Sequence, residues 1–123
     1  MTRQEIFTKV ARHLLRQKKK AASLDGHTCV YKTPRSGLKC AIGCLIPNKL
    51  YDPGMEGLGL EQNAQVQEVL RKVGVRCSRP VDQRFLSALQ KIHDDLDITP
   101  KDWPEKLRQL AKQHKLKMPQ VRS

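Results

Sequence analysis

The chain has 123 residues, the usual size of one domain, and carries 24 Lys or Arg against 12 Asp or Glu, for a formal net charge of +12. Aromatic residues make up only 4% of the chain, a composition that suits helices better than a sheet sandwich. No stretch approaches the roughly 20 apolar residues of a membrane-spanning helix, and the polar N-terminus does not resemble a signal peptide. We therefore expect a mainly helical protein that stays in the cytoplasm and contacts no membrane.

The positive charge is concentrated at the two ends of the chain. Residues 1–24 contain seven Lys or Arg and one Glu, and residues 101–123 contain seven Lys or Arg and two acidic residues. Residues 25–100 are nearly balanced, with ten basic and nine acidic residues. A charge of this size is informative about partners, and it favours a polyanion such as nucleic acid or an acidic protein surface.

The first element is an amphipathic helix, expected from residue 3 to about residue 20. Its apolar residues fall within one half of a helical wheel, opposite a basic side. These apolar residues are Ile6, Phe7, Val10, Ala11, Leu14 and Leu15. A loop is expected at residues 23–26, where Asp25 and Gly26 supply turn chemistry.

The next region combines an extended stretch at residues 28–32, a turn signal at 34–37 and the most apolar run of the chain at 38–46. This order predicts a short β-hairpin or a buried Cys-containing segment. After Pro47, three glycines at positions 54, 57 and 59 indicate an irregular loop of about ten residues.

Three further helices follow. Val66, Val69, Leu70 and Val73 recur at helical spacing up to Gly74, a typical C-terminal stop. The next helix is expected to open at Ser78 and Pro80, and its apolar stripe is Phe85, Leu89, Ile92 and Leu96. The last is expected to start at a capping box of Asp102, Trp103, Pro104 and Glu105 and to run to about residue 115.

The predicted fold class is therefore mainly α, with about four helices packed around a short β-hairpin or a buried Cys-containing segment. We expect residues 1–117 to form a single small globular domain. Residues 118–123 are expected to form a flexible basic tail.

Four residues form the one arrangement that resembles a metal site: His27, Cys29, Cys40 and Cys44. Zinc takes four thiolate or imidazole ligands in a tetrahedron, and a hairpin brings two pairs of ligands together. The single residue between His27 and Cys29 departs from the usual spacing of two to four. Cys40 and Cys44 lie in an apolar run, so buried structural thiols, with no cofactor, are the favoured interpretation.

The histidines and cysteines also allow catalytic hypotheses. A cysteine beside His27 or His93 would give thiol chemistry, although no cysteine-enzyme signature surrounds any of the four cysteines. His93 precedes a dense acidic cluster of Asp94, Asp95 and Asp97, which could hold a divalent metal. A structural role for the cluster is favoured, and no catalytic residue is assigned.

The basic ends carry the strongest functional signal. A helix that presents a row of basic side chains with one acidic residue among them is suited to follow phosphates. Because aromatic residues do not alternate with the basic ones, binding should depend on the backbone and on salt, and not on base stacking. The predicted binding residues are Lys9, Arg12, Arg16, Lys18, Lys19, Lys20, Lys106, Arg108, Lys112, Lys115 and Lys117.

Four features of the sequence form a recognisable pattern: the Gly-Leu-Lys-Cys-Ala-Ile-Gly-Cys-Leu-Ile-Pro run at 37–47, Leu-Tyr-Asp-Pro at 50–53, Ile-His-Asp at 92–94, and Trp103. In these features the chain resembles small uncharacterised proteins encoded by tailed bacteriophages and prophages. It implies a setting, the cytoplasm of a bacterial host, where accessory proteins of this size redirect or block host machinery. The basic ends depart from that pattern.

These observations lead to one hypothesis and two alternatives. The hypothesis is a non-enzymatic phage accessory protein that binds an anionic partner, either nucleic acid or a host nucleoprotein such as a defence complex that it inhibits. One alternative is a small zinc- or thiol-dependent enzyme that uses the cysteines with His27 and His93. The other is a purely structural assembly module.

Overall fold

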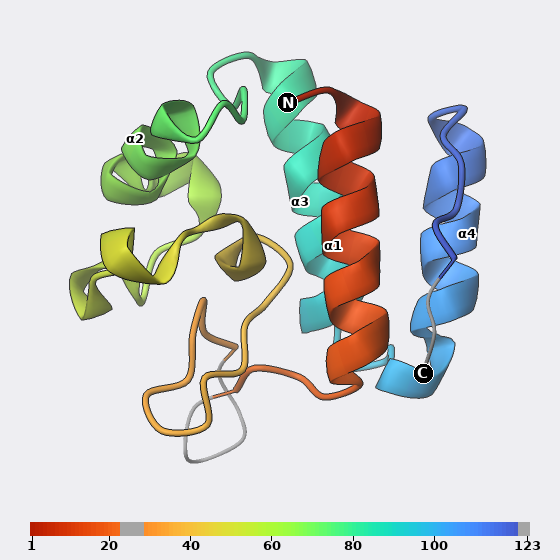
Figure 1. The fold of residues 1–123 in the computed structure, drawn as a ribbon, viewed down its shortest axis with the longest axis horizontal. Coiled ribbons are helices and arrows are strands. Elements are labelled where there is room, and N and C mark those ends of the chain that lie inside the picture. The colour runs from red at the N-terminus through yellow and green to blue at the C-terminus, as the bar shows by residue number, and fades with distance from the viewer. Residues whose placement is uncertain (23–28, 121–123) are drawn as a thin grey trace.

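The computed structural model describes residues 1–22 and 29–120 and confirms a mainly helical fold (Figure 1). The α-helices are α1 (Arg3–Gln17), α2 (Ala64–Lys72), α3 (Pro80–Asp94) and α4 (Trp103–Gln113). Short 3₁₀ helices lie between them: η1 (Gly43–Leu45), η2 (Asn48–Leu50), η3 (Pro53–Met55), η4 (Leu60–Gln62) and η5 (Pro100–Asp102). None of these described helices is both long enough and apolar enough to cross a membrane.

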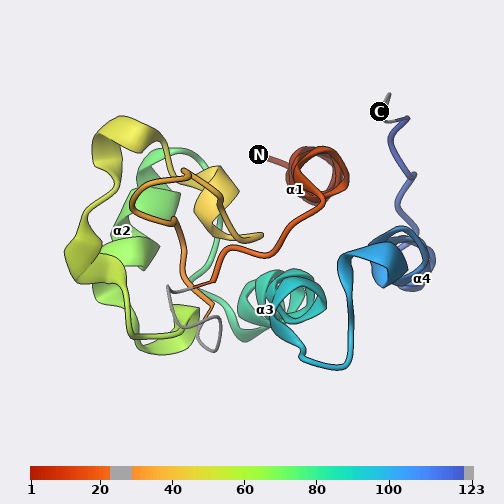
Figure 2. The ribbon, with the colours of Figure 1, turned by 90° about the horizontal axis from the view of Figure 1, so that it is seen from below.

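The helices form two groups. Helix α1 packs against both α3 and α4, and α3 packs against α4 (Figures 1 and 2). Helix α2 lies on the other side of α3, joined to the first group by the 3₁₀ turns, of which η1 contacts α1. The two basic ends of the sequence, carried by α1 and α4, are therefore neighbours in space.

Helix α1 forms where the hydrophobic pattern places it, and local chemistry fixes both of its ends. The Thr2 hydroxyl accepts from the Glu5 N–H at 3.1 Å, and the Glu5 carboxylate accepts from the Thr2 N–H at 2.9 Å, a complete capping box. Lys18 then adopts the left-handed conformation with φ of 56° and ends the helix. The helix therefore stops before residue 20, where the wheel pattern had extended it.

The short β-hairpin is a wrong prediction, whereas the buried Cys-containing segment is correct. Among the described residues there is no strand, and the region holds only two isolated bridges, Ala22 with Cys29 and Lys32 with Lys39. The physical reason is that side chains take the amides that a ladder would use. The Glu56 carboxylate accepts from the N–H groups of Tyr31 and Lys32 at 2.9 and 3.2 Å.

The apolar run at 38–46 is buried as predicted, but as a turn that leads into η1. Cys40, Ala41 and Ile42 are almost completely inaccessible to solvent. Gly43 approaches the carbonyl oxygen of Tyr31 so closely that a Cβ atom at this position would overlap it. The small residue thus lets two backbone segments meet inside the core.

Two details of the last two helices correct the sequence prediction. Helix α3 ends at Asp94, and Leu96 lies outside the helix with 80% of its surface exposed. The Asp95 carboxylate accepts from the Asp97 N–H at 2.9 Å, a local turn that competes with further helix. The capping box before α4 is formed by Thr99 and Asp102, one turn earlier than predicted.

The chain after α4 turns back alongside α4 (Figure 1). Lys115 adopts the left-handed conformation, with φ of 57°, and Leu116 and Met118 then pack against the core. The expected flexible tail was placed from residue 118, yet Met118 is half-buried. The last three residues of the chain are outside the described range.

Candidate binding surface

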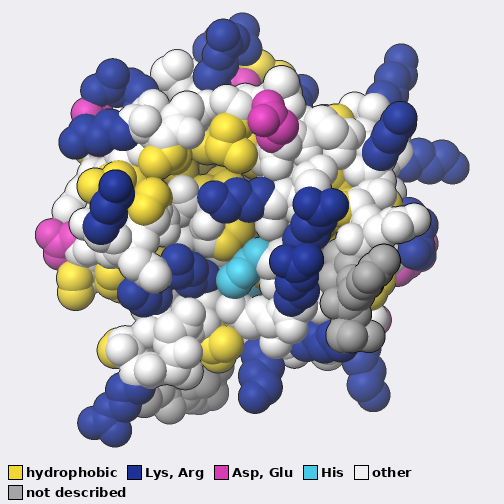
Figure 3. Space-filling view, viewed as in Figure 1, with side chains coloured by type: hydrophobic (Ala, Val, Ile, Leu, Met, Phe, Trp, Pro, Cys, Tyr) yellow, Lys and Arg dark blue, Asp and Glu magenta, His cyan; other side chains and the backbone are white. Residues whose placement is uncertain are grey.

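Three predicted binding residues lie together along the exposed side of α1. Lys9, Arg12 and Arg16 are exposed and line a shallow groove of about 870 Å³, shared with His13 of α1 and Cys44 of η1. On the face that carries α1, Lys and Arg side chains surround a hollow that holds a histidine, and few acidic side chains are visible (Figure 3). The sequence prediction for these three residues thus corresponds to one local surface.

The three basic side chains of this groove are not paired with carboxylates: no salt bridge within the described residues includes Lys9, Arg12 or Arg16. One acidic residue, Glu5, also lines the groove, and its carboxylate accepts from the Thr2 N–H. Asp82 binds Arg3 and Arg79. The groove therefore presents positive charge to solvent.

One flank of α1 is formed by the loop that carries Lys39. The Gln17 side chain accepts from the Lys39 N–H at 2.9 Å, and it donates to the Lys39 carbonyl at 2.9 Å. Nε2 of His13 lies 2.8 Å from the same carbonyl oxygen. Burial, followed by the charge of Lys32, lowers the pKa of Lys39 from its usual value.

Sequence reasoning missed Lys32 and Lys39. Both belong to the nearly neutral middle of the chain, and only the tertiary contact with α1 places Lys39 near its basic row. The charge of Lys9 is a further, smaller cause that lowers the pKa of Lys39. A surface that gathers positive charges favours an anionic partner.

The other flank of α1 is formed by the chain after α4. The Gln4 side chain donates to the Lys117 carbonyl at 2.9 Å and accepts from the Lys117 N–H at 2.8 Å. Its amide also donates to the Thr8 hydroxyl at 3.0 Å, which fixes its orientation. The backbone of Lys117 is therefore fixed beside Gln4, in the N-terminal part of α1.

The other predicted binding residues have mixed surroundings. Lys20 donates through Nζ to the carbonyl oxygen of Asp95 at 2.8 Å, and Arg108 forms an exposed pair with Glu105 at 3.0 Å. Lys106 of α4 is half-buried. The remaining members of the set, Lys18, Lys19, Lys112, Lys115 and Lys117, are exposed.

No aromatic ring is available for stacking on this surface. All five aromatic residues of the chain lie in the described range, and four of them, Phe7, Tyr31, Phe85 and Trp103, are buried. The fifth, Tyr51, is half-buried, and the ammonium of Lys32 lies 5.4 Å from its ring centre. The side chains exposed along α1 offer charge and hydrogen bonds and no stacking platform.

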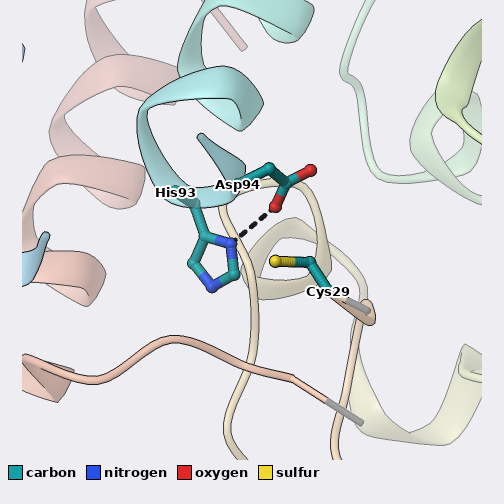
Figure 4. A group of neighbouring side chains, drawn as sticks. All are labelled: Cys29, His93 and Asp94. Carbon is teal, nitrogen blue, oxygen red and sulfur yellow. Dashed lines mark hydrogen bonds and ion pairs between the residues drawn. The ribbon is translucent and has the colours of Figure 1, made fainter. Parts of the chain in front are cut away.

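A second cluster, formed by Cys29, His93 and Asp94, lies at the C-terminal end of α3 (Figure 4). Their ligand-type atoms lie within 4.8 Å of one another, so the group could hold a metal ion. His93 is completely buried and stacks on Trp103, with ring centres 5.7 Å apart. Of the three predicted zinc ligands that the structure describes, Cys29, Cys40 and Cys44, only Cys29 belongs to this cluster.

Both ring nitrogens of His93 already have partners. Nδ1 lies 2.7 Å from a carboxylate oxygen of Asp94, and Nε2 accepts from the N–H of Ala21 at 2.9 Å. Because the Ala21 amide needs an unprotonated Nε2, the neutral ring carries its proton on Nδ1, the nitrogen that faces Cys29 and Asp94. A metal at Nδ1 would require the opposite tautomer, which brings two N–H groups face to face.

The cysteine thiols are held in their neutral form. Burial, followed by the charge of Asp94 and a hydrogen bond to it, raises the pKa of Cys29 to about 11. Burial likewise raises the pKa of Cys44 to about 12 and that of Cys40 further still. Because the thiolate is the nucleophile, this environment disfavours thiol catalysis.

Cys40 and Cys44, two of the other predicted zinc ligands, do not join the cluster. The sulfur of Cys40 accepts from the Gly43 N–H at 3.2 Å, and the thiol of Cys44 donates to the Ala41 carbonyl at 3.0 Å. His27 is outside the described residues. The two sulfurs therefore form hydrogen bonds with backbone groups of the turn in which they lie.

A pocket of about 590 Å³ opens beside this cluster. It lies between α3 and the turns before α2, and Cys29, Glu56, Gln90 and Asp94 contribute to its wall. Those polar groups serve the fold: Glu56 also accepts from the Tyr51 hydroxyl at 2.6 Å, and Gln90 accepts from the Ile42 N–H at 2.9 Å. Glu56 and Gln90 in the pocket wall thus hold the surrounding turns.

Comparison with known proteins supplies no relative: no family model, no curated protein and no solved structure matches this chain.

Proposed function

We propose that the protein binds double-stranded nucleic acid through the phosphate backbone, without base-specific contacts and without catalysis. The observation that supports this most is the groove along α1, where Lys9, Arg12 and Arg16 lie together and where no salt bridge among the described residues neutralises them. Backbone contacts from Lys and Arg supply most of the affinity of sequence-independent binding.

The residue types favour a duplex over a single strand. The basic residues of the row are three and four positions apart, which places them about 4.5 and 6 Å apart along the helix axis. Proteins that hold single strands combine a basic groove with exposed aromatic rings. The aromatic residues of this chain are buried or half-buried, so stacking would contribute little.

The biological setting of the proposal is a phage-infected bacterium, in which the protein would bind nucleic acid or a host nucleoprotein and block it. This setting depends on the resemblance of the 37–47 run to proteins of tailed phages. The basic groove itself supports the anionic partner and is independent of the setting.

Fluorescence anisotropy with labelled duplex DNA, duplex RNA and matching single strands, measured over a salt series, tests the proposal. We expect duplexes to bind at low salt. The logarithm of the affinity should then fall linearly with the logarithm of the salt concentration. Tighter binding of single strands would contradict the duplex assignment. Absence of binding to every nucleic acid at low salt would overturn the proposal, and binding of polyglutamate in the same assay would then favour an acidic protein partner.

Zinc or thiol chemistry at Cys29, His93 and Asp94 is the alternative that a specific observation favours, because their ligand-type atoms lie within 4.8 Å of one another. The hydrogen bond from Ala21 to His93 and the raised pKa of Cys29 act against it. Metal analysis of the purified protein separates the two proposals. One zinc per chain, lost in a Cys29→Ser variant, would support the alternative.

A further inference from the structure

Two glutamines of α1 each hold the backbone of a lysine from a distant segment. Gln4 bonds both the N–H and the carbonyl of Lys117, 113 residues away along the chain. Gln17 bonds both the N–H and the carbonyl of Lys39, 22 residues away. In each case the side-chain amide donates to the carbonyl and accepts from the N–H of the same lysine, the pair of hydrogen bonds that a neighbouring β-strand would make.

The two glutamines lie at opposite edges of the exposed arc of α1. At 3.6 residues per turn, their separation of thirteen positions corresponds to about 220° of rotation around the helix. The basic row of Lys9, Arg12 and Arg16 occupies the arc between them, and Gln4 and Gln17 both line the same groove. Each glutamine therefore holds a lysine-bearing segment on a different flank of the row.

The glutamines engage the lysine backbones and leave the Lys117 side chain free. Lys117 is exposed, and its hydrogen bonds with Gln4 are made by backbone atoms. Lys39 is half-buried, and its ammonium lies 3.4 Å from the carbonyl oxygen of Ile46, a long and weak hydrogen bond that a phosphate could replace. Holding the backbones fixes where these charges lie before a partner arrives, which lowers the entropic cost of binding.

We infer that Gln4 and Gln17 are positioning residues that assemble one composite duplex-binding surface from α1, the loop around Lys39 and the segment around Lys117. This inference depends on the proposed function. The partner is the phosphate backbone of a double strand, because a surface made of three basic segments is broad and lacks exposed aromatic rings. Replacing either glutamine removes no charge, yet it should remove a phosphate contact.

The test compares Gln4→Ala, Gln17→Ala and the double variant with the wild-type protein in the salt series on duplex DNA. Gln109→Ala is the matched control, since Gln109 is an exposed glutamine of α4. For each lysine lost from the interface, the slope of log affinity against log salt should fall in magnitude by about 0.9. Gln109→Ala should keep the wild-type slope.

A second measurement separates loss of position from loss of fold. Amide hydrogen exchange should show faster exchange at Lys117 in Gln4→Ala and at Lys39 in Gln17→Ala, while the α3 amides keep their protection. If both glutamine variants bind duplex DNA with the wild-type slope, the inference is overturned and the proposed function stands. If the wild-type protein binds no nucleic acid, both are overturned.

Discussion

The backbone N–H of Ala21 donates to Nε2 of His93 at 2.9 Å, which ties the chain just after α1 to the C-terminal end of α3. The same ring stacks on Trp103 of α4. One buried histidine therefore joins segments of all three helices of the larger group. This arrangement gives His93 a structural role that its place beside three carboxylates in the sequence does not reveal.

Replacing His93 with Ala should lower the free energy of unfolding by about 2–4 kcal/mol, because a buried amide loses its acceptor and a cavity opens beside Trp103. Urea unfolding followed by circular dichroism measures the change. His114→Ala is the control: His114 is half-buried and contacts the edge of Phe85, so its loss should be smaller. Equal losses in the two variants would contradict the structural role of His93.

Gly43→Ala should destabilise the protein strongly, by about 1–3 kcal/mol or more, because the new Cβ atom would overlap the backbone oxygen of Tyr31. Gly59→Ala is the matched control. Gly59 has φ of −70°, and a Cβ there would meet no atom within 4 Å. Thermal melts of the two variants report the difference. If Gly43→Ala melts at the wild-type temperature, the backbone at Gly43 and the carbonyl oxygen of Tyr31 lie further apart than the structure places them.

The cysteines of the native protein should react slowly with a thiol reagent near pH 8, because burial and the charge of Asp94 raise the pKa of Cys29 to about 11. The pKa values of Cys40, Cys44 and Cys77 are also raised by burial. All four thiols should react quickly in denaturant. Rapid modification of Cys29 in the native protein would instead indicate an activated thiol and revive the enzyme alternative.

Stability should decrease as the pH falls below about 6.5, the ordinary histidine value, because burial lowers the pKa of His13 in the folded protein. Between the folded and unfolded pKa values, the unfolded chain binds the proton more readily, so acid favours unfolding. Gln at position 13 could still donate to the Lys39 carbonyl but does not titrate. Urea unfolding at pH 7.5 and 5.5 should therefore show a smaller decrease for His13→Gln, and an equal decrease would contradict the assignment.

The sequence predicted the parts of the fold that depend on local pattern. The apolar stripes located α1, α2 and α4, and the most apolar run of the chain, at 38–46, is buried as expected. The β-hairpin was wrong because Glu56, 24 and 25 positions further along, takes the amides of Lys32 and Tyr31. A pattern of neighbouring residues carries no information about such a distant acceptor.

The candidate site was predictable to a similar degree. Helical periodicity placed Lys9, Arg12 and Arg16 on one side of α1, and the structure brings them to one groove. Lys39 could not be found this way, since its position beside α1 depends on the side chain of Gln17. The proximity of Cys29 and His93 was equally hidden, because 64 positions separate them in the sequence and only the tertiary fold brings Cys29 to the end of α3.

The most direct test of the central claim is the salt dependence of duplex DNA binding by two triple variants. One carries Lys9→Gln, Arg12→Gln and Arg16→Gln in the groove. The other carries Lys72→Gln, Arg76→Gln and Arg84→Gln, which removes the same number and types of exposed charges outside the groove.

Anisotropy titrations at several salt concentrations give the slope of log affinity against log salt for each protein. We predict that the slope of the groove variant is smaller in magnitude by about 0.9 for each phosphate contact removed. The control variant should keep nearly the wild-type slope. Equal slopes for the two triple variants would show that only total charge matters, and they would contradict a binding surface centred on α1.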